Sequence, residues 1–192
     1  IRAAENTRSI MLDVIIAMMP ALIWAIVKFG FRALTLTAVS VVGCMFFEWG
    51  YRKLMKKPQS VNDLSAAVTG ILLAFVCPVN MPYWMILVGD FFAIVVVKQL
   101  FGGIGMNFAN PALVGRIVLF VSFAGAMNNW VFPDAAVDQL SSATPLAVAD
   151  PNKLSLLDLF MGVHGGVLGE TCALAIVLGL IYLVVTKTIS IA

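Results

Sequence analysis

The chain has 192 residues, of which 61% are hydrophobic and only 11% charged, with a formal net charge of +2. Soluble domains are closer to half apolar and a quarter charged, so this composition excludes a soluble globular enzyme and a disordered segment. The few basic residues lie beside apolar segments, which excludes nucleic acid as a partner and leaves membrane lipid.

Six apolar segments follow one another and predict an all-α integral membrane fold in a single membrane domain over residues 1–192. They lie at about Ile10–Lys28, Ala33–Tyr51, Leu64–Val76, Trp84–Leu100, Pro111–Met127 and Val167–Thr186. Because a complete span needs about twenty residues, the segments at 64–76 and 111–127 are short. Gly and Pro at their ends are typical of broken helices in transporter-like folds. We therefore expect about six transmembrane or half-spanning helices.

The positions of Lys and Arg predict which side of the membrane each end faces. With the N-terminus in the cytoplasm, nine of the twelve basic residues are cytoplasmic, and three are external. The cytoplasmic ones are Arg2, Arg8, Arg52, Lys53, Lys56, Lys57, Lys98, Arg116 and Lys187; the external ones are Lys28, Arg32 and Lys153. The positive-inside rule therefore favours a cytoplasmic N-terminus and an external segment at residues 128–157.

Charged residues also occur within the apolar segments, where a charge costs several kcal/mol and marks a candidate functional site. Of these charged residues, Asp90 lies deepest within its apolar segment, between Trp84 and Val97. Lys98 follows eight residues later, about 12 Å along a helix, which is too far for a direct pair unless its side chain bends back. The structural alternative is a buried carboxylate bonded to a neighbouring helix or subunit. Asp13 and Glu48 could equally lie at an interface.

A glycine-rich segment, Phe101-Gly-Gly-Ile-Gly-Met-Asn-Phe-Ala-Asn-Pro-Ala-Leu113, precedes the fifth apolar segment. Asn110 is a predicted N-cap and Pro111 the first residue of the helix. The segment is neither a dinucleotide-binding fingerprint nor a P-loop. A re-entrant turn followed by a capped helix is its structural interpretation.

Two further segments carry candidate residues. Residues 128–157 form a long predicted loop that includes Asp138-Gln-Leu-Ser-Ser-Ala-Thr144-Pro-Leu146, in which Thr144 offers a hydroxyl among small residues. Such long loops are usually functional or disordered. Residues 162–174 lead into the last apolar segment, and Glu170 is expected near the start of that helix, where the helix dipole favours a carboxylate.

The three cysteines, Cys44, Cys77 and Cys172, are far apart in apolar stretches. No CxxC pair exists, so neither a metal site nor an iron–sulfur site within this chain is predicted. The cysteines are interpreted as small core residues; the alternative is that one of them reaches a site shared with another subunit.

The 138–144 stretch is similar to the flavinylation signature D-x-x-S-G-A-T, at whose threonine a transferase attaches FMN through a phosphoester. Asp138, Ser141, Ala143 and Thr144 match this signature, and Ser142 replaces its glycine. Together with the G-G-x-G-x-N-x-x-N-P-A-L and G-x-x-G-E-T-x-A-L stretches, it makes the whole chain resemble the D subunits of Rnf complexes. The B subunit of the sodium-pumping NADH:quinone oxidoreductase is a close relative of that family.

The resemblance implies a membrane component of a ferredoxin:NAD oxidoreductase coupled to sodium or proton translocation, in a bacterial inner membrane. It implies covalent FMN at Thr144 on the outer side and a second, non-covalent flavin, riboflavin, in the membrane part. The family fold is similar to urea transporters, with paired half-repeats. Family members are longer, so a fragment of a longer chain is expected. The implied partners are a flavin transferase and other Rnf subunits, including an external FMN-carrying subunit and membrane iron–sulfur subunits.

Within this framework, Gly105, Asn107 and Asn110 are predicted to line the riboflavin site, because an amide donates and accepts hydrogen bonds at once. Asp90 and Glu170 are candidates for the ion path, and no catalytic residue is predicted. The main alternative is a passive channel or transporter for a small polar solute, and the third is a structural membrane subunit. Neither a channel nor a structural subunit needs an exposed sequence for flavin attachment, so the 138–144 stretch argues against both alternatives.

Overall fold

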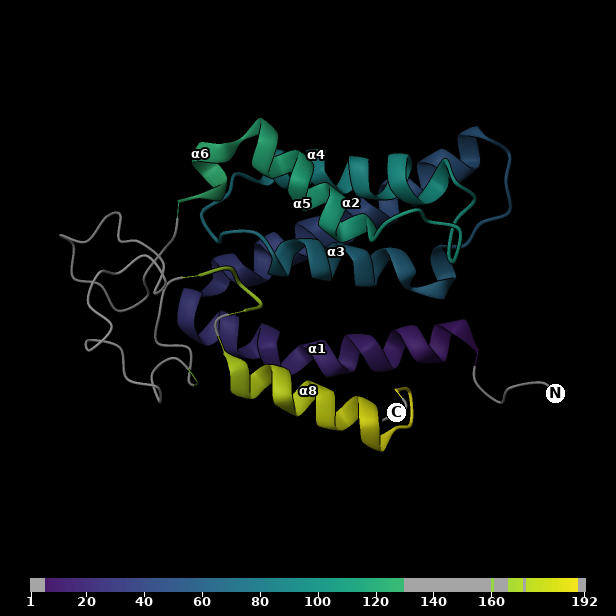
Figure 1. Ribbon diagram of the computed structural model, residues 1–192. Helices are drawn as coiled ribbons and strands as arrows, with labels where there is room; N and C mark the ends of the chain where they lie inside the picture. The colour runs from purple at the N-terminus through teal and green to yellow at the C-terminus, as the bar shows by residue number, and fades with distance from the viewer. Residues whose placement is uncertain (1–5, 130–159, 161–165, 171, 190–192) are drawn as a thin grey trace.

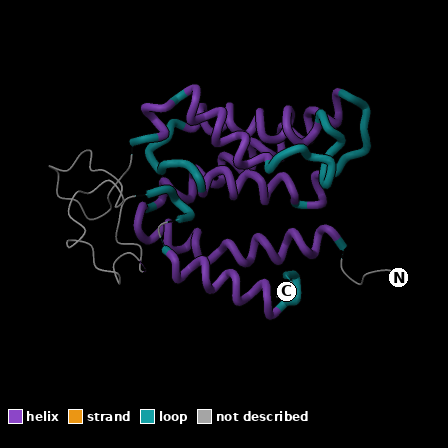
Figure 2. The backbone as a smooth tube through the Cα atoms, in the orientation of Figure 1, coloured by secondary structure: helices purple, strands orange, loops and turns teal. Residues whose placement is uncertain are grey.

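The computed structural model describes residues 6–129, 160, 166–170 and 172–189. Every regular element in these ranges is a helix (Figure 2). This confirms the predicted all-α class.

Two long helices begin the fold. Helix α1 (Thr7–Phe29) and helix α2 (Phe31–Leu54) are separated by Gly30, whose φ of 75° allows the chain to reverse between them. Both are long and apolar enough to cross a membrane. They match the first two predicted segments.

The next elements are shorter and pack on α2. Helix α3 (Ser65–Phe75) follows a 3₁₀ turn, η1 (Val61–Asp63). Helix α4 (Tyr83–Phe91) continues into a π-helix, η2 (Phe92–Gln99), and α5 (Pro111–Ser122) leads into the single turn α6 (Ala124–Met127). The 11 residues of α3 and 12 of α5 confirm the prediction of short, incomplete spans.

The last helix starts later than predicted. Helix α8 (Ala173–Val185) begins six residues after the expected Val167. The residues before it form backbone hydrogen bonds with another element instead. The amide of Gly169 donates to the carbonyl of Phe75 (2.9 Å), which holds this stretch against the end of α3. Helix α8 lies along α1 (Figure 1), where a Cβ added at Gly179 would collide with the carbonyl oxygen of Ala17.

The two ends of the bundle differ in charge. The start of α1, the end of α8 and the loop after α2 lie at one end, and α6 lies at the opposite end (Figure 1). The first of these ends carries the basic cluster that closes α2, Arg52 to Lys57. The helices thus alternate in direction as the predicted topology requires, and the side of the membrane that each end faces stays a prediction.

Helix α2 is apolar outside and polar inside. Its exposed face presents Val42 and Phe46, which are 66% and 60% exposed, whereas Ser40, Cys44 and Glu48 are fully buried. Water would reverse this pattern, and a lipid surrounding accounts for it, because polar side chains in a bilayer face the bundle interior. The chain is an integral membrane chain.

Close packing of α2 on α3 depends on Gly70. A Cβ added there would lie 2.8–2.9 Å from backbone atoms of Ser40 and Val41, which cannot move aside independently. Small residues at such crossings let two helix backbones approach.

We therefore expect Gly70→Ala to destabilise the chain by about 1–3 kcal/mol, the usual cost of overpacking a tight core. Thermal unfolding in detergent measures this effect. Gly50→Ala is the matched control, because a Cβ added at Gly50 of α2 has nothing within 4 Å. Equal melting temperatures for the Gly70→Ala variant and the parent would contradict the packing role.

Candidate functional site

A stripe of polar side chains runs along the buried face of α2. Ser40, Cys44, Glu48 and Arg52 follow one another at intervals of four residues, so they lie on one side of the helix. The first three are fully buried. They face α4 and η2, which supply the partners described next.

Glu48 forms a buried ion pair with Lys98 of η2. The Lys98 ammonium donates to Glu48 Oε2 at 2.9 Å, and the two side chains are 2% and 0% exposed. Gln99 Nε2 donates to the other oxygen, Oε1, at 2.9 Å, and Ser60 Oγ also donates to Oε1. Every oxygen of this carboxylate is therefore satisfied, as a buried charge requires.

The same lysine extends the network to α3. Its ammonium also donates to Ser65 Oγ, and Ser65 in turn donates to Asp63 Oδ1 at 2.6 Å. The backbone amide of Ser65 donates to the same oxygen at 2.9 Å, so Asp63 satisfies the amide of the first residue of α3. We call Glu48, Ser60, Asp63, Ser65, Lys98 and Gln99 the polar cluster.

Asp90 lies deeper and has no cationic partner among the described residues. Its Oδ1 is 2.6 Å from Ser40 Oγ and 3.2 Å from Cys44 Sγ. Its Oδ2 is buried and has no hydrogen-bond partner in the part of the chain that the structure describes. The expected alternative, a carboxyl bonded to a neighbouring helix, is therefore confirmed.

Arg52 ties the polar cluster to the glycine-rich turn. Its Nε donates to Gln99 Oε1 at 3.1 Å, and its Nη1 donates to the carbonyl of Pro58 at 2.6 Å. A Cβ added at Gly103 would lie 3.0 Å from Arg52 Nη2, so this glycine leaves room for the guanidinium. The φ values of Gly103 and Gly105, 108° and 81°, lie in the region that favours glycine.

The two asparagines of this turn have different surroundings. Asn110 caps α5, as predicted: its Oδ1 accepts from the amide of Ala112 at 3.0 Å. Asn107 Oδ1 is buried and has no hydrogen-bond partner within the described part of the chain. Gly105 is exposed, and a Cβ added there would meet nothing within 4 Å. The turn thus contains one unsatisfied acceptor and open space beside Gly105.

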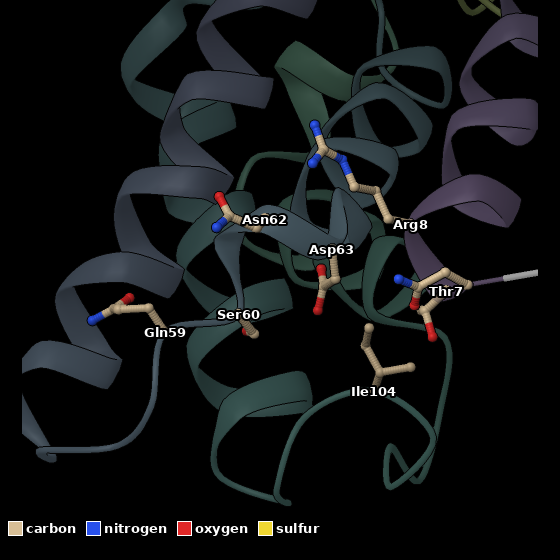
Figure 3. Close-up of a pocket in the computed structure, with 8 residues that line it drawn as sticks. Thr7, Arg8, Gln59, Ser60, Asn62, Asp63 and Ile104 are labelled. Carbon is tan, nitrogen blue, oxygen red and sulfur yellow. The ribbon is translucent and has the colours of Figure 1, made fainter.

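A polar pocket of about 640 Å³ opens at the same end of the bundle. It lies between the start of α1, which contributes Thr7 and Arg8, and residues 59–63, with Ile104 of the glycine-rich turn between them (Figure 3). Ser60 and Asp63 belong both to its lining and to the polar cluster. Its volume is in the range of small-molecule sites.

Glu170 and Asp90 have different partners. Glu170 stands three residues before the first residue of α8, near the start of that helix as predicted but outside its first turn. The chain here is held on α3 through Gly169, which delays the helix. Glu170 instead pairs with Arg116 of α5 at 3.9 Å, with both side chains partly exposed. The structure does not join the two predicted ion-path residues.

The flavinylation residues Asp138, Ser141, Ala143 and Thr144 lie outside the described residues. Within the described ranges, Ser40 and the polar cluster as a unit were not predicted. The four-residue spacing of polar side chains from Ser40 to Arg52, in an otherwise apolar helix, is the signal that could have found them. The three cysteines are buried, as expected.

Comparison with known proteins gives a match over the entire chain. The model of a family described as "NQR2, RnfD, RnfE family" matches residues 1–192. A curated relative from Acetobacterium woodii, the D subunit of a Na(+)-translocating ferredoxin:NAD(+) oxidoreductase complex, is 46% identical over 99% of this chain and 61% of its own length.

Two further relatives have similar names. The D subunit of the proton-translocating ferredoxin:NAD(+) oxidoreductase complex of Clostridium ljungdahlii is 34% identical over 99% of this chain and 61% of its own length. The D subunit of an ion-translocating oxidoreductase complex from Yersinia enterocolitica is 39% identical over 82% of this chain and 43% of its own length. The chain therefore spans about three fifths of the first two relatives.

Proposed function

The chain belongs to the NQR2, RnfD, RnfE family, and from this membership we propose that it is a membrane subunit of an Rnf-type ferredoxin:NAD oxidoreductase that carries electrons through flavins. The observation that carries the proposal is the family match over residues 1–192 together with the S-x-A-T-P-L stretch at 141–146. The relatives' names, which include sodium-, proton- and ion-translocating complexes, support coupling of electron flow to ion movement.

The first flavin of the proposal is FMN, linked through its phosphate to the hydroxyl of Thr144. Asp138, Ser141 and Ala143 complete the sequence that a flavin transferase reads. The proposed topology puts Thr144 on the outer side of a bacterial inner membrane, with the N-terminus in the cytoplasm. The charged end at Arg52–Lys57 supports this orientation.

The second flavin of the proposal is riboflavin at the glycine-rich turn. Asn107 fits this group, because its buried Oδ1 lacks a partner and could accept from a ring N–H. Gly105 fits as well, because nothing lies within 4 Å of the position of an added Cβ. Asn110 already uses its Oδ1 as a helix cap, which leaves its amide nitrogen for the ring. When bound, a flavin supplies one-electron and two-electron transfer.

Further Rnf subunits, among them an external FMN-carrying subunit and membrane iron–sulfur subunits, are the proposed electron donors and acceptors. Asp90 and Glu170 remain proposed ion-path residues. A small-solute channel of the urea-transporter type is the second candidate, favoured only by the short helices α3 and α5. A channel has no use for a bound flavin, so flavin content separates the two.

The proposal is tested on the full-length chain produced together with its flavin transferase. We expect a denaturing gel of this protein to show a flavin-fluorescent band, because only a covalent cofactor survives denaturation. The same chain produced without the transferase is the control and should be dark. A dark band in both samples would contradict the flavin-carrying function and favour the channel.

The second-flavin site gives a separate prediction. We expect Asn107→Ala to lose most of the riboflavin that the purified chain releases on denaturation, because the amide is the unsatisfied acceptor of the turn. Covalent flavin fluorescence should be unchanged. Asn80→Ala is a suitable control, since Asn80 lies in the loop between α3 and α4. Full riboflavin in the Asn107→Ala variant would put the site elsewhere.

A further inference from the structure

We infer that Asp90 holds a proton in the interior of the membrane and exchanges it with the Arg52 end of the bundle along the polar face of α2. This role rests on the proposed place of Asp90 in the ion path and deepens it by naming the ion that Asp90 binds; it requires neither flavin, so it can fail independently of the flavin assignments. Its chemistry is the binding of one proton by one carboxylate, with no electron transferred.

The hydrogens around Ser40 indicate the protonation state of Asp90. Ser40 Oγ lies 2.9 Å from the carbonyl oxygen of Gly70 and 2.6 Å from Asp90 Oδ1. Both distances are those of O–H···O hydrogen bonds. A hydroxyl has a single hydrogen to donate, and the Gly70 carbonyl can only accept. If Ser40 donates to Gly70, the hydrogen in the second contact must come from Asp90, which is then a carboxylic acid.

The two buried acids of this region have different partners. Glu48 has an ammonium at 2.9 Å and donors to both oxygens, the arrangement that an ionised carboxylate needs. Asp90 has no ion-pair partner among the described residues, and its Oδ2 accepts no hydrogen bond. An ionised Asp90 would leave a buried charge uncompensated, which costs far more than burying the neutral acid.

The surroundings fit a proton better than a metal cation. Hard cations such as Ca²⁺ and Mg²⁺ take six or more oxygen ligands. The oxygens recorded around Asp90 are those of Ser40 and, beyond it, Gly70. A thiol, Cys44, completes the contacts of Asp90 Oδ1. The space beside Oδ2 is narrow, since a Cβ added at Gly43 would lie 2.8 Å from it.

The route follows from what lies on either side of Asp90. Toward the Arg52 end, the next residues on the stripe are Cys44 and Glu48, so polar groups recur at every turn of α2. In the opposite direction the same stripe continues to Leu36. There Leu36 packs in one fully buried apolar core with Leu73, Ile86 and Leu119. Exchange is therefore expected from the Arg52 end alone.

Other titratable groups on the packed elements do not supply a counter-charge. Cys44 of α2 is a thiol in contact with Asp90. Lys98 of η2 is paired with Glu48, and Arg116 of α5 is paired with Glu170. The cations of Lys98 and Arg116 are thus paired with carboxylates other than that of Asp90.

Infrared spectroscopy of the full-length chain in an ester-free detergent tests the proton directly. A protonated carboxyl has a C=O stretching band that a carboxylate lacks. We expect this band at neutral pH in the parent, its loss in Asp90→Asn, and its retention in Glu48→Gln. Ser40→Ala is a second variant that should shift the band, since it removes the hydrogen-bond partner. No such band in the parent, or its persistence in Asp90→Asn, would overturn the inference.

The route is tested by the rate at which the same band shifts after transfer into D₂O. Cys44→Val replaces a polar member of the stripe, and we expect it to slow the shift at least tenfold. Leu36→Val, at an equivalent position on the opposite side of Asp90, should leave the rate within twofold of the parent. Equal rates in the two variants would overturn the route. Neither readout involves flavin, so the result is independent of the flavin assignments.

Discussion

Thr144→Val is expected to abolish covalent flavin completely. The proposed phosphoester needs an oxygen nucleophile on an accessible segment, and valine keeps the size of threonine without its hydroxyl. Thr144→Ser should retain a reduced but measurable fraction, because it keeps the hydroxyl. Intact mass measurement of the full-length chain, produced with its transferase, distinguishes the three forms by the presence or absence of one FMN.

Two controls make this result specific. Thr186→Val removes a hydroxyl from the end of α8 and should leave the FMN mass in place. Asp138→Asn should lower the loaded fraction without abolishing attachment, since Asp138 is proposed to serve recognition by the transferase. An FMN mass that persists in Thr144→Val would assign the linkage to another residue.

The second large effect is expected at the buried ion pair. Lys98→Met removes the closest cation of the Glu48 carboxylate, which is 0% exposed, and leaves it only the more distant Arg52 Nε at 3.8 Å. Breaking one side of a buried pair costs about 3–5 kcal/mol, because an uncompensated charge remains in a poorly solvated site. We expect a large fall in the thermal unfolding temperature of the chain in detergent, and a similar fall for Glu48→Gln.

The double variant Glu48→Gln with Lys98→Met identifies the cause. It removes both charges, so its cost should be clearly less than the sum of the two single costs. The partly exposed pair Arg116–Glu170, at 3.9 Å, is the matched control, and Arg116→Met should cost less than about 1 kcal/mol. Additive losses in the double variant would show that the pair is not coupled.

The stability of the polar cluster matters for the proposed second flavin site. Arg52 contacts Gln99 of the cluster and lies beside Gly103 of the glycine-rich turn. Loss of the ion pair is therefore expected to disturb the turn and the pocket lined by Ser60 and Asp63. Riboflavin content should fall in Lys98→Met even though Lys98 is not proposed to touch the ring.

Neighbouring residues alone are enough to predict the class of the protein and the course of most of its helices. Long apolar runs identify α1 and α2 because hydropathy is a local property, and the Asn110–Pro111 cap of α5 is likewise readable from adjacent positions. The basic residues beside each span predict an orientation because they, too, can be identified from neighbouring positions in the chain. The predicted start of the last helix is six residues early, since the segment around Gly169 is apolar but its amide pairs with the distant Phe75 carbonyl.

Which buried polar groups meet depends on the packing of distant helices. Glu48 and Lys98 are separated by 50 positions, as are Ser40 and Asp90, and no local pattern specifies such pairs. The partner of each group depends on how α2 is aligned with α4 and η2. That alignment gives Glu48 a cation and leaves Asp90 with a hydroxyl and a thiol. Two acids of similar chemistry therefore have different partners, and the charge states inferred for them differ because a buried carboxylate needs donors and a counter-charge around it to stay ionised.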